Sequence, residues 1–299
     1  MRYSSGQRGQ TVNLLATPSK VRILVSPPLP ANQTMKETCT ILVCSCDAYG
    51  DLLKPFSKLF LKYWRDCPFE KVLVTQSPLD DNLCFDRVIS CGIDTTWCER
   101  LVCALKQIST PYVLMLCDDY YLESSVNTSA IAKRLEQIKK LNGVNLRLIP
   151  NPKINKASAM PVEGENLFEY KKNIAYSIST LAGFWNREFL INLSKGKSSI
   201  WEFERYGSFS CSDESRPILV TPSKEFPFLD VVHKGYWEKY GVELCLSNGI
   251  DLDLSSRTLP PFSVKTKEFF KALIFAIFPN TLIVKTQNAL SLGAKEKKR

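Results

Sequence analysis

The sequence lacks the patterns of the commonest metal and nucleotide sites. It has no Cys-x-x-Cys pair and a single histidine, His233, so the usual spacing of structural zinc ligands is missing. No Gly-x-Gly-x-x-Gly follows the first predicted strand, and no Gly-x-x-x-x-Gly-Lys-Ser/Thr occurs anywhere. The sequence therefore lacks the motifs that usually indicate dinucleotide-dependent redox chemistry or P-loop hydrolysis.

Long hydrophobic runs are also missing. The longest uninterrupted apolar run covers residues 272–278, far short of the ~20 residues that a membrane-spanning helix needs. Residues 21–25 are too short and too interrupted for the core of a signal peptide. These absences predict a cytoplasmic protein.

The positive charge of the chain is concentrated at its two ends. Residues 1–34 carry four basic and no acidic side chains, and residues 263–299 carry eight basic and two acidic ones. Of the formal net charge of +9, nothing positive remains for the residues between. A nucleic-acid-binding domain needs its basic stripe on the folded body, so we expect no nucleic-acid partner.

The composition is that of an ordinary folded protein. Of the 299 residues, 44% are hydrophobic and 23% charged, and this length accommodates one large α/β domain or two smaller ones. The eleven cysteines are an odd number and mostly lie in apolar runs. This favours free thiols in a reducing compartment over a disulfide scaffold.

Three regions follow from the pattern along the chain. Residues 1–34 show no sustained period and are predicted to be disordered or a mis-assigned start, since the regular pattern begins only after Met35. A single large domain is expected over 35–255, with halves at 38–150 and 151–255. Residues 256–299 form a basic, amphipathic segment, either a peripheral contact with an anionic membrane or a final helix with a solvated tail.

Strand-like and helix-like segments alternate between residues 38 and 150. Short β-branched apolar runs predict strands, and runs with apolar residues three and four apart predict helices. Thr96 and Glu99 form a capping box ahead of one of these helices. The predicted strands are residues 40–44, 71–75, 87–90, 112–117 and 144–149. This order predicts an α/β fold with a mainly parallel central sheet and helices on both faces.

An acidic pair follows the most hydrophobic of these strands. Asp118 and Asp119 come directly after residues 112–117, and ligands of such sheets bind at the carboxyl ends of the strands. Neighbouring carboxylates at a buried edge repel each other, and a divalent cation such as Mg²⁺ or Mn²⁺ would relieve that repulsion. The alternative is that one of the two aspartates caps the following turn or helix.

Several segments together resemble one enzyme family. Residues 40–57 (TILVCSCDAYGDLLKPFS), 92–101 (GIDTTWCERL) and 112–122 (YVLMLCDDYYL) are similar to the nucleotide-sugar half of a GT-A glycosyltransferase, in particular to family-2-like bacterial enzymes that build surface polysaccharides. Residues 179–190 (STLAGFWNREFL) and 198–208 (SSIWEFERYGS) resemble the acceptor half. The likeness covers roughly residues 38–255 and implies a Rossmann-like, GT-A-like fold.

The resemblance also implies roles for individual side chains. Those expected to contact the nucleotide sugar are Asp47, Tyr49, Asp94, Trp97, Arg100, Asp118 and Lys234. Asp119, Asp118 and His233 would hold Mn²⁺ or Mg²⁺. The acidic motif departs from a strict Asp-x-Asp, because Cys117 precedes the pair and Tyr120 follows it. A lone histidine is also often a satisfied structural residue.

A base for the transfer is expected in the second half. Glu204, and after it Glu202, lie beside Trp201 and Phe203, whose aromatic surface suits a sugar ring and would raise a carboxylate's pKa. Period-2 alternation allows another arrangement, in which a surface strand turns both aromatic side chains inward and both glutamates to water.

The expected function is therefore a metal-assisted, inverting transfer of a sugar from a nucleotide-diphosphate sugar to a glycan or lipid-linked acceptor. The setting would be the synthesis of cell-surface polysaccharide such as capsule or lipopolysaccharide, at the inner face of the membrane. Two alternatives stay open: a degenerate carbohydrate-binding or membrane-associated scaffold protein, and a sugar-phosphate nucleotidyltransferase, whose usual glycine-rich phosphate loop is missing after the first strand.

Overall fold

A computed structural model describes residues 31–79 and 83–261 of the chain. The predictions made for residues 1–30, and for most of the basic C-terminal segment, lie outside this range. Helix α1 (Ala31–Thr38) begins inside residues 1–34, which were predicted to be disordered or a mis-assigned start, so the regular structure starts earlier than Met35. No helix in the described ranges has the length and apolar character needed to cross a membrane.

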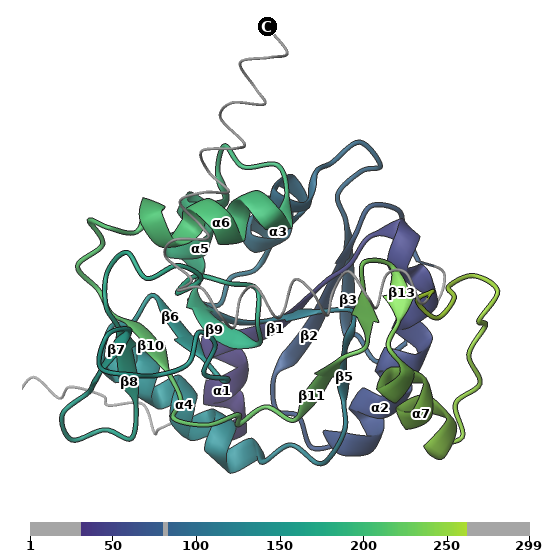
Figure 1. Cartoon of the computed structure of the whole chain (residues 1–299), viewed down its shortest axis with the longest axis horizontal. Coiled ribbons are helices and arrows are strands. Elements are labelled where there is room, and N and C mark those ends of the chain that lie inside the picture. The colour runs from purple at the N-terminus through teal and green to yellow at the C-terminus, as the bar shows by residue number, and fades with distance from the viewer. Residues whose placement is uncertain (1–30, 80–82, 262–299) are drawn as a thin grey trace, which may run out of the picture.

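A large mixed sheet forms the centre of the molecule (Figure 1). Its nine strands lie in the order β3-β2-β1-β4-β9-β6-β10-β8-β7. Their bounds are β1 Cys39–Cys44, β2 Glu70–Thr75, β3 Arg87–Ser90, β4 Tyr112–Cys117, β6 Asn145–Arg147, β7 Ala159–Pro161, β8 Phe168–Tyr170, β9 Gly183–Asn186 and β10 Ile218–Val220. Among the strands of this sheet in the described residues, seven run in one direction and β9 and β8 oppose them, so the sheet is mostly parallel.

Helices cover both faces of this sheet, as the alternation of strands and helices predicts. Besides α1 they are α2 Leu53–Tyr63, α3 Trp97–Gln107, α4 Thr128–Lys140, α5 Arg187–Ser194, α6 Ile200–Ser210 and α7 Lys239–Ser247, and a 3₁₀ turn, η1 (Asp47–Leu52), precedes α2. Helices α2 and α4 pack on one face, and α3, α5 and α6 on the other (Figure 1).

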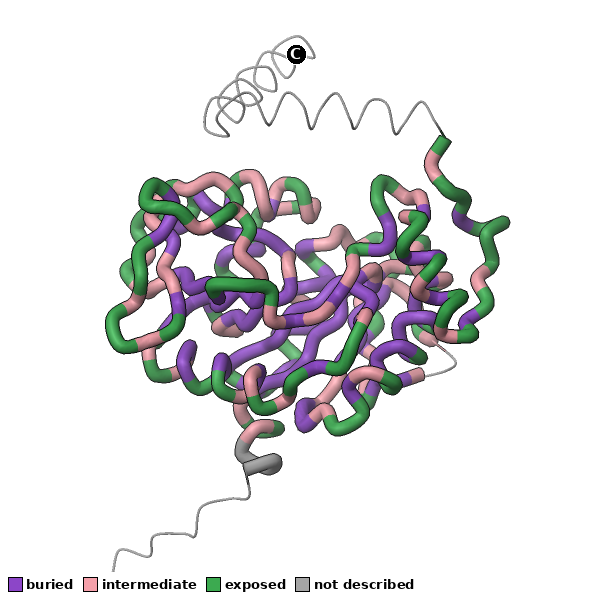
Figure 2. Tube along the Cα trace, turned by 60° about the horizontal axis from the view of Figure 1, so that its bottom comes forward, coloured by how far each residue is buried: buried purple, intermediate pink, exposed green. Residues whose placement is uncertain are grey.

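The alternation of side chains along the strands divides the core into two layers. Ile41 and Val43 of β1 belong to the cluster under α2 and α4, whereas Leu42 and Cys44 belong to the cluster under α3 and α5. All six residues of β1 and all six of β4 are buried, as Figure 2 shows along the middle of the molecule. A strand that is buried on both faces has a continuous apolar run in its sequence, and for this reason both strands could be predicted well from the sequence.

Two small ribbons extend the fold beyond the sheet. Strand β5 (Tyr120–Leu122) pairs antiparallel with β11 (Phe228–Asp230), and β12 (Val232–His233) pairs antiparallel with β13 (Tyr236–Trp237). Both ribbons lie at the end of the parallel strands where β4 finishes. Neither ribbon was predicted, because strands of two or three residues carry too little periodicity.

The structure confirms some local predictions and corrects others. The capping box of Thr96 and Glu99 is present at the start of α3. Residues 200–210 form helix α6, so the alternative of a surface strand around Glu202 and Glu204 is wrong. Cys91 and Cys103 form a disulfide, which the sequence did not predict, while the other nine cysteines are free thiols.

Candidate functional site

A pocket of about 620 Å³ opens at the carboxyl ends of β1 and β4. This is a typical size for a small-molecule site, and the position is the one where ligands of parallel sheets bind. The lining side chains come from strand ends, from α3 and α6 and from the two ribbons. They include Cys44, Ser45, Cys46, Tyr49, Trp97, Arg100, Cys117, Asp118, Asp119, Tyr120, Asn151, Pro152, Tyr176, Thr180, Trp201, Glu204, Asp230, His233 and Lys234.

Most of the side chains predicted from the sequence meet in this pocket. Those that line it are Tyr49, Trp97, Arg100, Asp118, Asp119, Glu204, His233 and Lys234. Asp47, Asp94 and Glu202 are not among the lining residues. The pocket therefore joins residues from both predicted halves of the chain.

Asp118 and Asp119 directly follow β4. Because β4 runs parallel to β1 in the centre of the sheet, the pair lies beside the carboxyl end of β1. The Asp118 backbone N–H donates to the carbonyl of Cys44 at 3.3 Å, which continues the β1–β4 pairing by one step. Asp118 is buried, and desolvation raises its pKa to about 7 in spite of a hydrogen bond from Ser45. The chain then continues into β5, and no helix follows that the pair could cap.

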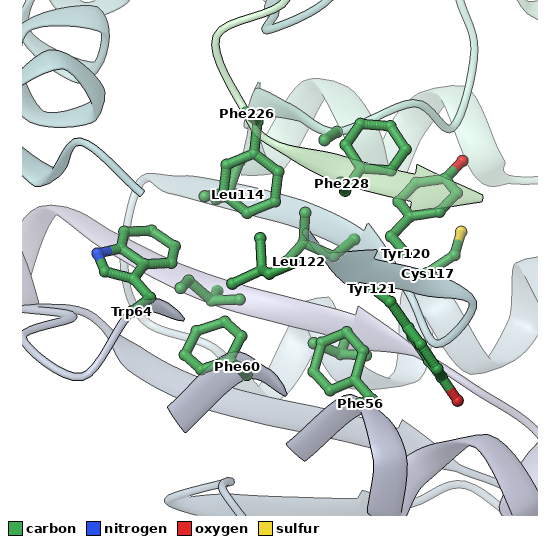
Figure 3. Close-up of a cluster of buried hydrophobic side chains, with 14 of the residues drawn as sticks. Phe56, Phe60, Trp64, Leu114, Cys117, Tyr120, Tyr121, Leu122, Phe226 and Phe228 are labelled. Atoms are coloured by element: carbon green, nitrogen blue, oxygen red, sulfur yellow. The ribbon is translucent and has the colours of Figure 1, made fainter. Parts of the chain in front are cut away.

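The β5–β11 ribbon adds a third carboxylate that the sequence did not indicate. Pairing places Asp230 opposite Tyr120, and the Val231 N–H donates to the Asp119 carbonyl at 2.9 Å. Aromatic rings anchor the ribbon: Tyr120 packs on Phe228 with centroids 4.4 Å apart, and Phe56 and Phe60 of α2 lie below, with Trp64 just after the helix (Figure 3). Burial of these rings holds Asp119 and Asp230 side by side.

The resulting cluster of carboxyl groups holds protons more tightly than usual. Desolvation, followed by the neighbouring charge of Asp118, raises the pKa of Asp119 well above its ordinary value. Partial desolvation also raises the pKa of Asp230, which shares a side-chain hydrogen bond with Asp119. The Asp119 Oδ1 atom is buried without a hydrogen-bond partner in the described part of the chain. The cluster is therefore an incomplete polar site.

A tight turn carries the basic side chains of the pocket. His233 and Tyr236 pair across the β12–β13 ribbon, so Lys234 and Gly235 form its two-residue loop. Both loop residues have positive φ, 52° at Lys234 and 81° at Gly235, as a type I′ hairpin turn requires. This turn brings His233 and Lys234 to the rim beside Asp230, and the charge of His233 opposes the rise in the Asp230 pKa.

Glu204 enters the pocket from α6 with one oxygen already held. Its Oε1 accepts from the Thr180 backbone N–H at 2.7 Å and from the Thr180 hydroxyl at 2.8 Å. No hydrogen bond to Oε2 comes from the described residues. The carboxylate is thus oriented by two donors while its second oxygen is available, which suits a general base.

The residues that precede Glu204 in α6 make different contacts. Glu202 accepts from the Ser198 N–H at 2.9 Å, and its own N–H donates to the Ser199 hydroxyl, so it stabilises the first turn of α6. Phe203 is fully buried against Trp97, with ring centroids 5.5 Å apart. Trp201 has 68% of its surface exposed and lines the pocket.

Two predicted nucleotide contacts lie on loops beyond the lining residues. Asp47 follows β1, and its carboxylate accepts from the Ser77 N–H at 3.0 Å and the Ser77 hydroxyl at 2.6 Å. These bonds lower the pKa of Asp47. Asp94 is exposed on the turn between β3 and α3. Both residues lie at carboxyl ends of parallel strands.

Asp230 and Thr180 are two pocket residues with polar contacts in the site that sequence reasoning missed. Asp230 precedes the histidine of the sequence by three positions, and that acid–histidine spacing was the available signal. Thr180 lies within the segment that resembles an acceptor half, but nothing local marks a threonine as the partner of a glutamate 24 positions later.

The donor set suits a divalent cation only in part. Asp118, Asp119 and Asp230 supply hard oxygen ligands, and the unpartnered Asp119 Oδ1 offers a free one. No group of three or more His, Cys, Asp or Glu side chains within the described ranges has the geometry of a complete metal site. The arrangement fits an ion such as Mg²⁺, which takes one or two carboxylates and completes its shell with phosphate oxygens and water.

Comparison with known proteins gives likenesses of structure alone. No family model matches the sequence. No curated protein matches it. Among solved structures, residues 1–349 of S. aureus TarS share 13% identity over 64% of this chain and 59% of that one, with a TM-score of 0.39.

Two further solved structures are similar in the same degree. The mannosyltransferase PcManGT of Pyrobaculum calidifontis, in complex with GDP-Man and Mn²⁺, has 14% identity over 68% of this chain and 59% of that one, with a TM-score of 0.42. The UTP-bound UGPase of Acinetobacter baumannii has 9% identity over 78% and 98%, with a TM-score of 0.47. The chain spans less than two thirds of the TarS and PcManGT chains.

Proposed function

We propose that this chain is a glycosyltransferase that moves a sugar from a nucleotide-diphosphate sugar to a glycan or lipid-linked acceptor. One observation carries the proposal: a single pocket combines a desolvated acidic cluster, the basic turn of His233 and Lys234, and an oriented Glu204. The first two suit a metal-bound diphosphate, and the third suits deprotonation of a hydroxyl group.

The donor would lie over the carboxyl ends of β1 and β4. Lys234 would place its ammonium against the diphosphate, and His233 and the acidic cluster would lie beside it. Mn²⁺ or Mg²⁺ bound through Asp118, Asp119 or Asp230 would neutralise charge on the diphosphate. Tyr49, Trp97 and Arg100 are the lining residues left for the nucleoside, with Asp47 and Asp94 on the adjoining loops.

The transfer itself would invert the anomeric centre. The acceptor hydroxyl oxygen forms a bond to the anomeric carbon while the bond from that carbon to the diphosphate oxygen breaks. Glu204 takes the hydroxyl proton on Oε2, since Thr180 holds Oε1. The nucleoside diphosphate leaves with the electron pair of the broken bond, and Lys234 stabilises its charge.

The acceptor would enter past the exposed aromatic side chains of the rim. Trp201 and Tyr176 both line the pocket and have 68% and 39% of their surface exposed. Exposed rings at a polar pocket are suitable for stacking on sugar rings. We propose an acceptor sugar there, in keeping with a role in cell-surface polysaccharide synthesis at the inner face of the membrane.

A thermal-shift panel tests the proposal directly. UDP, GDP, CDP and dTDP are each added with and without Mn²⁺ to the wild type, to Asp119→Asn and to Asp86→Asn, an exposed carboxylate paired with Lys71. Saturation at 100 times the Kd should add roughly 2.7 kcal/mol to stability. A metal-dependent rise with one nucleotide in the wild type and Asp86→Asn, lost in Asp119→Asn, supports the proposal.

The opposite result rejects it. If none of the four nucleotides stabilises the wild type with Mn²⁺, the diphosphate site does not exist and a scaffold function takes its place. If one nucleotide binds, release of its diphosphate from the corresponding nucleotide sugar tests transfer. Release of pyrophosphate from the triphosphate and a sugar phosphate would identify a nucleotidyltransferase instead.

A further inference from the structure

Arg257 is a buried arginine that joins two separate turns beside the pocket. It is 8% exposed although it lies in a loop after α7, and four hydrogen bonds hold its guanidinium. Nε and Nη2 donate to the two carboxylate oxygens of Asp51, each at 3.0 Å. Nη2 also donates to the Ala48 carbonyl at 3.1 Å, and Nη1 donates to the Gly235 carbonyl at 3.0 Å.

The first of these turns carries Tyr49, which lines the pocket. Ala48 and Asp51 belong to η1, the 3₁₀ turn between β1 and α2. The Arg257 guanidinium lies over the Tyr49 ring, 4.4 Å from its centroid. Arg257 therefore holds the backbone of η1 and the ring of Tyr49 together.

The second turn carries the basic side chains of the pocket. Gly235 completes the two-residue loop in which Lys234 has a φ of 52°, a conformation that a lysine adopts only when its surroundings enforce it. The bond from Arg257 to the Gly235 carbonyl holds this loop against η1. Figure 1 shows β13 beside the purple segment that leads into α2.

We propose that Arg257 is a positioning residue for nucleotide binding, because its single guanidinium sets the separation between Tyr49 and Lys234. The inference rests on the proposed function and adds a residue outside the pocket to it. Only a planar group with five donors can bind one carboxylate at two points and two carbonyls at once. Lysine would keep the charge and lose this geometry, so substitution by lysine separates the two contributions.

Arg134 provides a matched control elsewhere in the molecule. It is 5% exposed and binds Glu225 through Nε and Nη2, so it resembles Arg257 in burial and in its two-point carboxylate contact. Arg134 does not line the pocket. Arg257→Lys and Arg134→Lys should therefore reduce overall stability to a similar extent, while only Arg257→Lys changes the pocket.

The experiment compares the two variants with the wild type in two measurements. The first is hydrogen exchange at residues 47–52 and 233–237, which needs no ligand. The second is the Kd for UDP, GDP, CDP and dTDP in the presence of Mn²⁺. Arg257→Lys should accelerate hydrogen exchange in both segments together. It should also raise the Kd of whichever nucleotide the wild type binds, roughly 10- to 100-fold, the usual effect of losing an outer positioning partner. Arg134→Lys should leave both quantities at their wild-type values.

Two results would overturn the inference. One is acceleration confined to residues 47–52, which would mean that Arg257 does not couple the turns. The other is a nucleotide Kd for Arg257→Lys equal to that of Arg134→Lys. If the wild type binds none of the nucleotides, the proposed function fails, and the exchange measurement still decides whether the turns are coupled. Asp51→Asn removes one of the two carboxylate oxygens that Arg257 binds, and it replaces Arg257→Lys should that variant not fold.

Discussion

Two groups of buried charges in this molecule are arranged in opposite ways. Arg134 on α4 donates to the Glu225 carboxylate through Nε at 2.7 Å and through Nη2, and the Gln137 side-chain oxygen and the Asn166 carbonyl accept from its Nη1. At the end of β4, Asp118 and Asp119 have like charge, and one buried oxygen has no partner among the described residues.

The difference separates a structural role from a binding role. In a satisfied buried ion pair each charge compensates the other, so removing one partner leaves the other charge buried and uncompensated and destabilises the fold. A cluster of desolvated carboxyl groups lowers the stability of the free protein, and that cost is offset only when a cation or a donor binds. Substitutions in the two regions should therefore have different effects on stability and on turnover.

Glutamate-to-glutamine substitutions should give opposite results in the two regions. Glu204→Gln removes the proton acceptor but keeps the contact to Thr180, so release of nucleoside diphosphate from the donor should fall by about 10²- to 10⁴-fold with an unchanged nucleotide Kd. Glu225→Gln should lower the stability and leave the turnover unchanged. If Glu204→Gln turns over at the wild-type rate, Glu204 is not the general base.

Breaking the ion pair should affect stability alone. Arg134→Met leaves Glu225 without its partner, and we expect a loss of about 3 kcal/mol in the free energy of unfolding. Urea denaturation followed by circular dichroism measures this loss. The nucleotide-induced thermal shift should keep its wild-type size, and a smaller shift would show that α4 communicates with the pocket.

The acidic cluster should make the free protein less stable as the pH rises. Asp118 has a pKa of about 7 in the folded protein and an ordinary value of 3.8. The contribution of Asp118 to the free energy of unfolding is fully present below pH 4. It is lost as the pH rises through 7, because the unfolded chain releases the proton at a lower pH than the folded protein does. Asp118→Asn should therefore match the wild type near pH 4 in metal-free buffer.

The stabilities of the wild type and Asp118→Asn should then diverge between pH 4 and pH 7. At pH 8 we expect Asp118→Asn to be more stable than the wild type by several kcal/mol, ~1.4 kcal/mol for each pKa unit between the ordinary and the folded-state value. Thermal unfolding at several pH values measures this gap. A constant gap at every pH would mean that ionisation of Asp118 is not its cause.

The exposed aromatic rim should show the smallest effect. Trp201→Ala removes a ring with 68% of its surface in solvent, so stability should stay within about 0.5 kcal/mol of the wild type. The KM for a glycan acceptor should rise about tenfold, and Trp201→Phe should restore most of it. An unchanged acceptor KM in Trp201→Ala would place the acceptor elsewhere.

The two halves of the chain differ in how far local pattern predicts them. Strands β1 and β4 are buried on both faces, so their continuous apolar runs identified them, and the acidic pair after β4 followed directly. In the second half, β9 opposes its neighbours and α6 begins at Ile200, where alternation also allowed a strand. Helix and strand patterns in such short amphipathic segments overlap, so packing decides between them.

Local patterns in the sequence were enough to predict parts of the candidate site: the strand-end carboxylates, the capping box of α3 and the glutamates of α6. Which of these residues meet depends on how distant segments pack. Asp230 lies beside Asp119 because β11 pairs with β5 more than a hundred residues earlier, and Glu204 is oriented by Thr180 from another loop. These contacts depend on burial and strand pairing between distant segments, whose free energy belongs to the assembled core and leaves no periodic signal along the chain.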